Sequence, residues 1–262
     1  MKPKVKLDDY DFDAVKVSRT DNESELPNFK SSRFKQVDIE FEPHSPEMNN
    51  SNVVGVVYSG GWDSTLLMLR NIEARRFIQP ILFGYVDDDA IREIGLKILS
   101  AKYGRFILPP ISVSQLTIGG NVENNCCGQQ AYIHFMLGFL PVDLLPMLSE
   151  IQVGYVMNDD AISFLDELRS LTKTHFGIQQ KLNIPVTYPL TKISRDEVHE
   201  EVKQKLGDFC TCISCERPDI KFYKKDDDLV MLMEACGDCV SCRKDKMYND
   251  FTRFMYVKIP HL

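Results

Sequence analysis

The chain has 262 residues, of which 44% are hydrophobic and 26% are charged, so it can bury one main domain with at most a small appendage. Its formal net charge of -7 disfavours a nucleic-acid partner, because an acidic surface repels phosphate backbones, although a small nucleotide stays compatible with it. No apolar run approaches the roughly 20 residues that cross a bilayer, and the start MKPKVKLDDYDFD lacks the apolar centre of a secretion signal, which together predict a cytoplasmic protein without membrane contact.

Residues 1–52 form a polar N-terminal extension. The segments SRTDNESELPN and EPHSPEMNNSN are rich in turn-forming residues, which indicates loops. Between them, FKQVDIEFE alternates Val37, Ile39 and Phe41 with charged neighbours. This pattern predicts one half-buried strand in an otherwise loose segment.

Residues 53–208 alternate apolar strands with amphipathic helices. The expected strands are 53–59, 80–86, 105–113, 151–157 and 184–190, and the expected helices are 64–76, 87–104, 129–140, 159–173 and 194–207. Continuous apolar strands separated by helices are typical of a parallel sheet covered on both faces. The sequence therefore predicts an α/β domain with a parallel five-stranded sheet.

Residues 209–262 hold six of the eight cysteines, and the segment 245–259 (DKMYNDFTRFMYVKI) predicts a C-terminal helix. In the reducing cytoplasm such cysteines are metal ligands or core residues more often than disulfides. The chain is thus expected to divide into an N-terminal extension, 1–52, a nucleotide-binding domain, 53–208, and a cysteine-rich zinc-binding segment with a helix, 209–262.

The stretch VVYSGGWDST, residues 56–65, joins the first strand to the first helix through a glycine turn. Such a turn directs backbone N–H groups and the positive end of the helix dipole into one concavity, which suits an anion. Glycines let the backbone approach phosphate oxygens, and the hydroxyls of Ser59, Ser64 and Thr65 can add hydrogen bonds. Asp63 would repel phosphate unless it binds a bridging Mg²⁺ or orients the loop. The alternative is a plain turn with a serine cap.

This turn, Ser59-Gly60-Gly61-Trp62-Asp63-Ser64, resembles the SGGxDS signature of the PP-loop ATP pyrophosphatases. The resemblance implies ATP cleaved between its α and β phosphates, with AMP placed on a substrate carboxylate or carbonyl for displacement by a nucleophile. It implies ATP and Mg²⁺ as cofactors, Ser59, Asp63 and Ser64 as catalytic residues, and a cofactor-binding set of Tyr58, Ser59, Gly60, Gly61, Asp63, Ser64, Thr65, Tyr85 and Val86. Trp62 is left to pack against either the sheet or the adenine.

The late cysteines fall into two groups, CTCISC (Cys210, Cys212, Cys215) and CGDCVSC (Cys236, Cys239, Cys242), with 20 residues between them. Cys-x2-Cys presents two sulfurs to one ion, and tetrahedral zinc needs four, so three cysteines of one group and one of the other satisfy it. Structural zinc is the prediction. Buried unliganded thiols and an iron–sulfur cluster are the alternatives.

Together with the glycine turn, the CGxCxxC run followed by basic residues resembles the 7-cyano-7-deazaguanine synthases, over about residues 52–250. In that group a Ser-Cys precedes the run, as in Ser214-Cys215, and a Pro-Leu and a Ser-x-x-Glu-Val segment precede both, as in 189–190 and 194–198. The resemblance implies Cys215, Cys236, Cys239 and Cys242 as zinc ligands. Cys210 and Cys212 are then not zinc ligands, or one of them replaces Cys215.

The chain departs from this family where the substrate pocket is expected. An acidic run, Asp87–Asp89, follows the second strand, 124–130 lacks the family's arginine, and the fourth strand leads to Asn158 and Asp160. The alternative role for the acidic run is to cap the next helix. Asn158, Asp160 and Gln129 are predicted to bind a purine-like substrate.

Four other residues with reactive side chains are predicted to have structural rather than catalytic roles. We expect Cys126-Cys127 to be a buried helix start rather than a nucleophile, and His134 and His175 to be polar contacts rather than bases. No general base is identifiable.

The leading prediction is an ATP-dependent carbon–nitrogen ligase that adenylates a carboxylate, 7-carboxy-7-deazaguanine by resemblance, and transfers it to an amine. One alternative is a QueC-like relative of the kind found in anti-phage gene clusters, which conjugates the activated deazaguanine to a protein or another acceptor. Another is a nucleotide-binding scaffold without turnover. The partners expected are a small purine-like carboxylate and an amine donor; a protein acceptor and a homodimer stay open, and the acidic charge disfavours tRNA thiolation.

Overall fold

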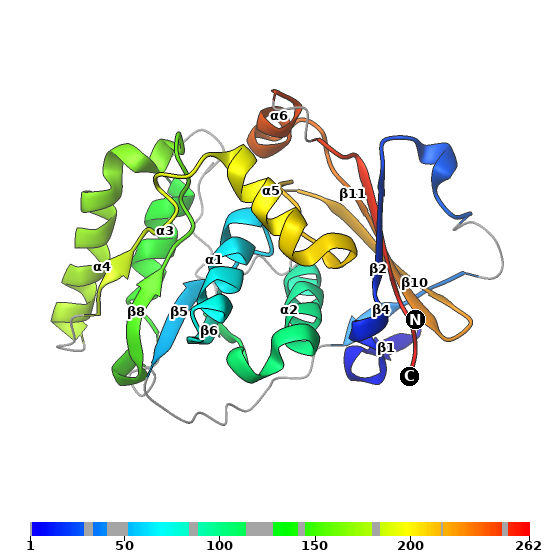
Figure 1. Ribbon diagram of the computed structural model, residues 1–262, viewed down its shortest axis with the longest axis horizontal. Helices are drawn as coiled ribbons and strands as arrows, with labels where there is room; N and C mark the ends of the chain where they lie inside the picture. Colours follow the sequence, from blue (N-terminus) through cyan, green and yellow to red (C-terminus); the bar gives the residue numbers. More distant parts are fainter. Residues whose placement is uncertain are drawn as a thin grey trace. The chain divides into compact units, whose positions relative to one another are not determined.

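The computed structural model describes residues 2–28, 34–40, 52–83, 89–113, 128–140, 145–179, 184–215, 217–247 and 251–262 (Figure 1). Contacts group the chain into two compact units. We call Met1–Pro43, Glu93–Lys102 and Lys203–Leu262 the antiparallel-sheet unit, and His44–Arg92 and Tyr103–Val202 the parallel-sheet unit. Within the described residues, no helix combines the length and apolar character that crossing a membrane needs.

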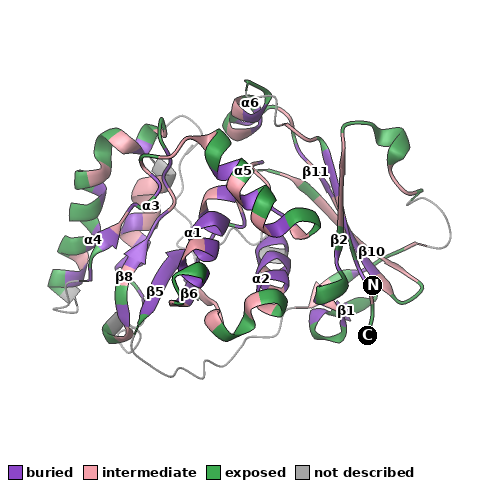
Figure 2. Cartoon of the chain, viewed as in Figure 1, coloured by how far each residue is buried: buried purple, intermediate pink, exposed green. Residues whose placement is uncertain are grey.

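The parallel-sheet unit is built on five parallel strands in the order β7-β6-β5-β8-β9. The strands are β5 (Val53–Val57), β6 (Phe77–Phe83), β7 (Ile111–Val113), β8 (Leu148–Gln152) and β9 (Val186–Thr187). Every residue of β5 is buried, which explains its uninterrupted apolar sequence (Figure 2). The predicted α/β class and parallel five-stranded sheet are confirmed.

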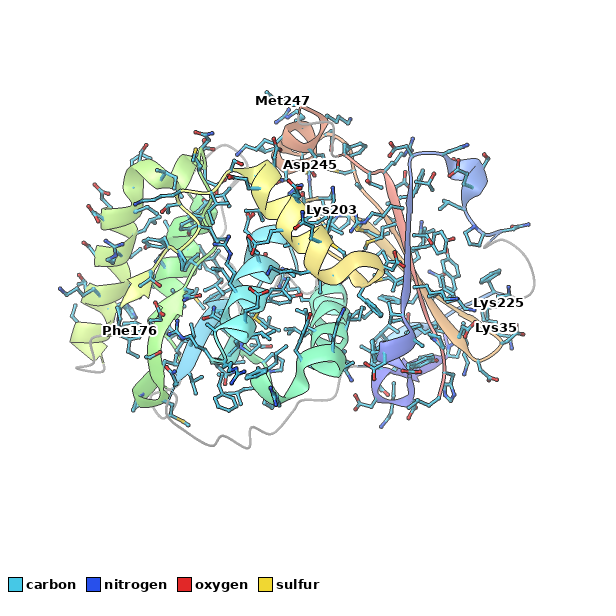
Figure 3. The ribbon with its side chains drawn as sticks, viewed as in Figure 1. Lys35, Phe176, Lys203, Lys225, Asp245 and Met247 are labelled. Atoms are coloured by element: carbon cyan, nitrogen blue, oxygen red, sulfur yellow. The ribbon has the colours of Figure 1, made fainter. Side chains whose placement is uncertain are left out.

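Five helices follow these strands along the chain: α1 (Trp62–Glu73), α2 (Asp89–Tyr103), α3 (Gly128–Leu137), α4 (Leu165–Gln179) and α5 (Arg195–Leu206). The chain moves from β5 outward to β6 in one direction and from β8 to β9 in the other. Because such crossovers are right-handed, α1 and α4 cover opposite faces of the sheet. Phe176 of α4 is completely buried in the core that this helix shares with α3 and β8 (Figure 3).

The reversal of direction between β5 and β8 creates a topological switch point. These neighbouring strands are parallel, and their chain connections leave toward opposite faces. In open α/β sheets ligands bind outside the carboxyl ends of the strands at such a point. The glycine turn follows β5 directly, so the fold places it there.

The antiparallel-sheet unit contains a five-stranded sheet in the order β2-β12-β11-β10-β3. Its strands are β2 (Lys16–Thr20), β12 (Phe254–Ile259), β11 (Asp228–Glu234), β10 (Asp219–Lys225) and β3 (Lys35–Gln36). A separate parallel pair joins β1 (Lys4–Lys6) to β4 (Asp38–Glu40). The N-terminal segment thus supplies both edge strands of the larger sheet, where the sequence predicted one strand in a loose extension.

The predicted C-terminal helix over 245–259 is wrong. Helix α6 (Val240–Met247) ends within that segment, and β12 covers its last six residues, pairing with both β11 and β2. Met255, Val257 and Ile259 are completely buried and alternate with Tyr256 and Lys258. This period of two is typical of a strand, and the position between two neighbours satisfies the backbone on both sides.

Candidate nucleotide and metal sites

The glycine turn is held in shape by its own hydrogen bonds. Ser59 and Ser64 share a hydrogen bond between their hydroxyls, 3.1 Å, and the Ser64 hydroxyl also donates to the Gly61 carbonyl, 3.1 Å. The backbone N–H of Ser59 donates to Ser64 Oγ at 3.2 Å, and that of Gly61 to Ser59 Oγ at 3.3 Å. Gly60 has φ +77°, a conformation that only glycine adopts without strain. The turn is therefore organised by residues of the motif itself.

Helix α1 begins at Trp62, two residues before the predicted start at residue 64, with Gly61 as its N-cap. Glycine has no side chain with which to cap this N-terminus. Thr65, in the first turn, is 2% exposed, and its hydroxyl has no hydrogen-bond partner among the described residues. A helix start with a glycine N-cap beside a buried hydroxyl can accept an anion.

A cation that the sequence reasoning missed lies beside the turn. Arg92 of α2 is 6% exposed, and its Nη1 donates to the Phe83 carbonyl at 2.8 Å, at the end of β6. A Cβ placed on Gly60 would lie 3.5 Å from Arg92 Cγ. This puts a buried positive charge at the carboxyl ends of β5 and β6, where it favours a bound anion. Its only sequence signal is that it is the first basic residue after Asp87–Asp89.

The loop after β8 reaches the start of α1. A Cβ placed on Gly154 would lie 3.0 Å from Asp63 Cβ and 3.3 Å from the Ser64 nitrogen, so a larger residue would push the two segments apart. The predicted substrate residues Asn158 and Asp160 follow in this loop, both exposed, with Asn158 at φ +70°. The switch point thus brings both loops together.

Five further residues with predicted roles stay untested. Tyr85 and Val86 lie outside the described residues, as do Cys126 and Cys127, and the side chain of Gln129 in α3 is not described. Their assigned roles remain predictions.

Trp62 packs on a neighbour that the sequence did not indicate. Its ring is 7% exposed and stacks on that of His199 in α5, with centroids 4.3 Å apart and planes at 29°. Farther along α1, Arg70 donates to both carboxylate oxygens of Glu201, at 3.1 and 2.5 Å. Helix α5 therefore braces the helix that carries the turn.

His134 is a buried polar contact, as predicted. Its Nδ1 lies 2.9 Å from the Thr172 hydroxyl. Burial, with the charge of Arg169 second, lowers the His134 pKa to about 4, so the ring is neutral near pH 7. His175 lies against the rings of Phe135 and Phe139, at 5.3 and 4.8 Å between centroids.

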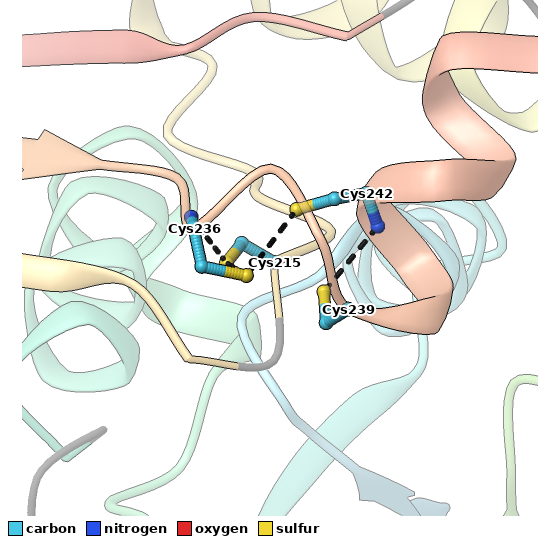
Figure 4. Close-up of side chains that lie close together, drawn as sticks. All are labelled: Cys215, Cys236, Cys239 and Cys242. Atoms are coloured by element: carbon cyan, nitrogen blue, oxygen red, sulfur yellow. Dashed lines mark hydrogen bonds between the residues drawn. The ribbon is translucent and has the colours of Figure 1, made fainter.

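The structure gathers Cys215, Cys236, Cys239 and Cys242, with their sulfurs all within 4.8 Å of one another (Figure 4). The Sγ atoms of Cys215 and Cys236 are 3.5 Å apart, and those of Cys236 and Cys242 are 3.9 Å apart. Tetrahedral ligands with zinc–sulfur bonds of about 2.3 Å would be separated by about 3.8 Å. The predicted four-cysteine cluster is confirmed, with dimensions that fit one metal ion.

The electrostatics of this cluster also favour a cation. Burial raises the pKa of Cys215 to about 11 and raises that of Cys242 as well, so the apolar surroundings oppose thiolates in the absence of a metal. A divalent cation reverses this preference because it binds the deprotonated sulfur. Among the described residues, Cys210 and Cys212 are not part of the group.

Comparisons with known proteins do not assign a function to these sites. No protein-family profile matches the sequence, and no curated protein matches it. A solved structure described as a predicted subunit of tRNA methyltransferase from Methanocaldococcus jannaschii is similar with a TM-score of 0.35 and 14% identity, over 58% of this chain and 74% of that one.

A 4-thiouridine synthetase in complex with RNA and bound ATP is similar with a TM-score of 0.40 and 12% identity, over 80% of this chain. The match covers 55% of that protein, so the chain spans about half of its length. Both TM-scores lie below 0.5, and neither likeness bears on activity. The resemblance to the 7-cyano-7-deazaguanine synthases stays a prediction.

Proposed function

We propose that the chain is an ATP-dependent ligase that binds the nucleotide phosphates at the turn Ser59–Thr65 and activates a carboxylate by adenylation. The observation that carries the proposal is the start of α1 at a glycine N-cap, behind a positive-φ glycine turn, at the switch point between β5 and β8. A helix start of this kind can offer backbone N–H groups to phosphate oxygens.

The surrounding residues would support the same chemistry. The substrate carboxylate attacks the α-phosphorus, the bond to the β-phosphate breaks, and pyrophosphate leaves with its negative charge. The helix dipole, Arg92 and the Thr65 hydroxyl would stabilise that charge. A bound Mg²⁺ would neutralise it further, with Asp63 as its carboxylate ligand.

In the second step an amine attacks the acyl carbon of the acyl adenylate, and AMP leaves. We take 7-carboxy-7-deazaguanine as the carboxylate and ammonia as the amine, which gives an amide that a second ATP can dehydrate to the nitrile. Asn158 and Asp160, exposed in the loop after β8, would hydrogen-bond the purine-like edge. The loop's approach to Asp63 through Gly154 supports this placement.

The four-cysteine cluster would hold a structural zinc ion. All four ligands are sulfur and three of the four cysteines are buried, which is typical of closed structural sites rather than catalytic ones. The ion would fix the turn before α6 without taking part in the reaction.

The nucleotide step can be tested through Trp62, the only tryptophan of the chain. Because this residue opens α1, titration with Mg²⁺ and a non-hydrolysable ATP analogue should give a saturable change in its fluorescence. Gly60→Ala should weaken the affinity at least about tenfold, because the positive φ is strained for alanine. Gly177→Ala, with open space around the added Cβ, is the matched control. Unchanged fluorescence in the native protein at millimolar analogue would overturn the proposal.

The chemical step needs a separate assay with ATP, 7-carboxy-7-deazaguanine and ammonia. Release of pyrophosphate together with nitrile or amide product supports the ligase. Pyrophosphate release with mass added to a co-incubated protein would redirect the proposal to conjugation, and nucleotide binding without turnover would replace it with a scaffold.

A further inference from the structure

The loop after β8 carries the expected substrate residues on a structured turn. Asn158 and Asp160 are exposed in this loop, whereas Asp159, which lies between them, is only partly exposed. A polar side chain on a loop binds a substrate well only if the backbone that carries it is already ordered, because ordering the loop costs part of the binding energy. The ligase reaction as proposed gives Asp159 no role.

Residues 156–159 form a hydrogen-bonded turn. The Asp159 N–H donates to the Val156 carbonyl at 3.1 Å, which is the bond that closes a turn of four residues. Asn158, the third residue of the turn, has φ +70°, and asparagine tolerates this left-handed conformation better than most residues other than glycine. The turn therefore presents Asn158 to solvent in a defined backbone conformation.

The Asp159 carboxylate closes the same turn a second time. Its Oδ2 accepts a hydrogen bond from the Val156 N–H at 2.9 Å, so Val156 and Asp159 are joined by two hydrogen bonds. Val156 is 1% exposed, and water therefore has little access to its N–H. Removing the carboxylate would leave a buried donor without its acceptor, which disfavours the present conformation of the turn.

Asp159 is also the N-cap residue of the short helix η8 (Asp160–Phe164). An N-cap carboxylate ordinarily accepts hydrogen bonds from the N–H groups of its own helix. Among the described residues the Asp159 side chain does not cap η8, and it accepts instead from Val156, on the other side of the turn. The carboxylate therefore stabilises the turn rather than the helix.

Neighbouring segments hold the turn at both of its ends. The Met157 N–H donates to the Ile193 carbonyl at 2.8 Å, in the loop that follows β9. At the other end Gly154 is close to the start of α1, where an added Cβ would lie 3.0 Å from Asp63 Cβ. The turn thus lies between the loop after β9 and the glycine turn, and Asp159 fixes its conformation there.

We propose that Asp159 is a positioning residue for the purine-like carboxylate substrate, because it holds residues 156–159 in the conformation that presents Asn158 to the edge of the ring system. This role rests on the proposed ligase function, through the assignment of Asn158. Asp159 acts through the backbone and does not contact the substrate itself. The nucleotide site should be unaffected, because the hydroxyl bonds of Ser59 and Ser64 lie within the glycine turn.

The test is calorimetric titration of the full-length protein, saturated with Mg²⁺ and a non-hydrolysable ATP analogue, with 7-carboxy-7-deazaguanine. Asp159→Ala should weaken binding of the carboxylate about tenfold, and Asp159→Asn, which keeps an acceptor oxygen, should stay within about twofold of the native affinity. Asp166→Ala removes the same charge from an exposed site paired with Arg169 and should change nothing. The Trp62 response to the ATP analogue should be the same in all three variants.

The outcomes separate this role from the ligase function. Native carboxylate affinity in Asp159→Ala, or an equal loss of affinity for the ATP analogue, would overturn the positioning role. If Asp159→Ala does not fold, Asn158→Gly decides, because glycine adopts the positive φ; it should also bind the carboxylate about tenfold more weakly, and native affinity would refute the role. Carboxylate binding by the native protein without pyrophosphate release would exclude the ligase reaction alone. No carboxylate binding by the native protein would overturn both.

Discussion

The glycine turn and the four-cysteine cluster are two candidate sites built in opposite ways. The turn is a run of consecutive residues, 59–65, which its own serine hydroxyls hold together. The cluster joins Cys215 to a group that begins 21 positions later, with the hairpin β10–β11 between them. The hydrogen bonds of the turn are thus formed within the motif itself, whereas four thiols this close together would need a bound cation to become thiolates.

The sharpest test of this contrast is loss of the metal. Cys236→Ser removes one of four sulfur ligands, so zinc content should fall and the free energy of unfolding should drop by an amount on the order of 3 kcal/mol. Zinc analysis and thermal unfolding measure both effects. Cys212→Ser should keep the ion. The contrast fails if Cys236→Ser retains full zinc, or if the nucleotide response of Trp62 disappears while the parallel-sheet unit remains folded.

Acid should weaken the parallel-sheet unit through His134. Its pKa is about 4 in the fold and 6.5 in the unfolded chain, so the folded state resists protonation. The contribution is complete above pH 6.5 and is lost as the pH falls toward 4, by at most about 3 kcal/mol. His134→Gln should flatten this pH dependence in urea unfolding at constant zinc. Parallel slopes for the variant and the native protein would show that His134 is not the group responsible.

The backbone of the turn should tolerate side chains poorly. Gly60→Ala imposes a positive φ on alanine, which costs about 1–2 kcal/mol, while zinc content should stay unchanged. Denaturant unfolding and metal analysis check this. If the variant is as stable as the native protein, the turn accommodates alanine without a loss in the free energy of unfolding.

The smallest expected effect concerns the brace between α1 and α5. Arg70→Met removes a bidentate ion pair with Glu201 whose partners are 37% and 27% exposed, so solvent screening limits the loss to about 0.5 kcal/mol. A small shift of Trp62 emission is expected as well. Lys221→Met, which breaks an exposed ion pair with Asp219, is the control. Equal emission spectra in the two variants would argue against the brace.

Sequence reasoning worked best where residues close together carry the pattern. The apolar run Val53–Val57, the glycines of the turn and the Cys-x2-Cys spacing each follow from local chemistry. It failed for β12, because a mixed polar and apolar segment after a short helix fits either helix or strand until its neighbours are known.

The sequence alone predicted the α/β class, the position of the glycine turn and the four cysteines that lie together. Tertiary structure alone decided that β2 pairs with β12 across more than two hundred residues, that Arg92 lies close to Gly60, and that Arg19 donates to the Cys210 carbonyl. Periodicity and spacing describe what a segment can do with its own atoms. Contacts between distant segments depend on how whole elements pack, which a local sequence pattern does not specify.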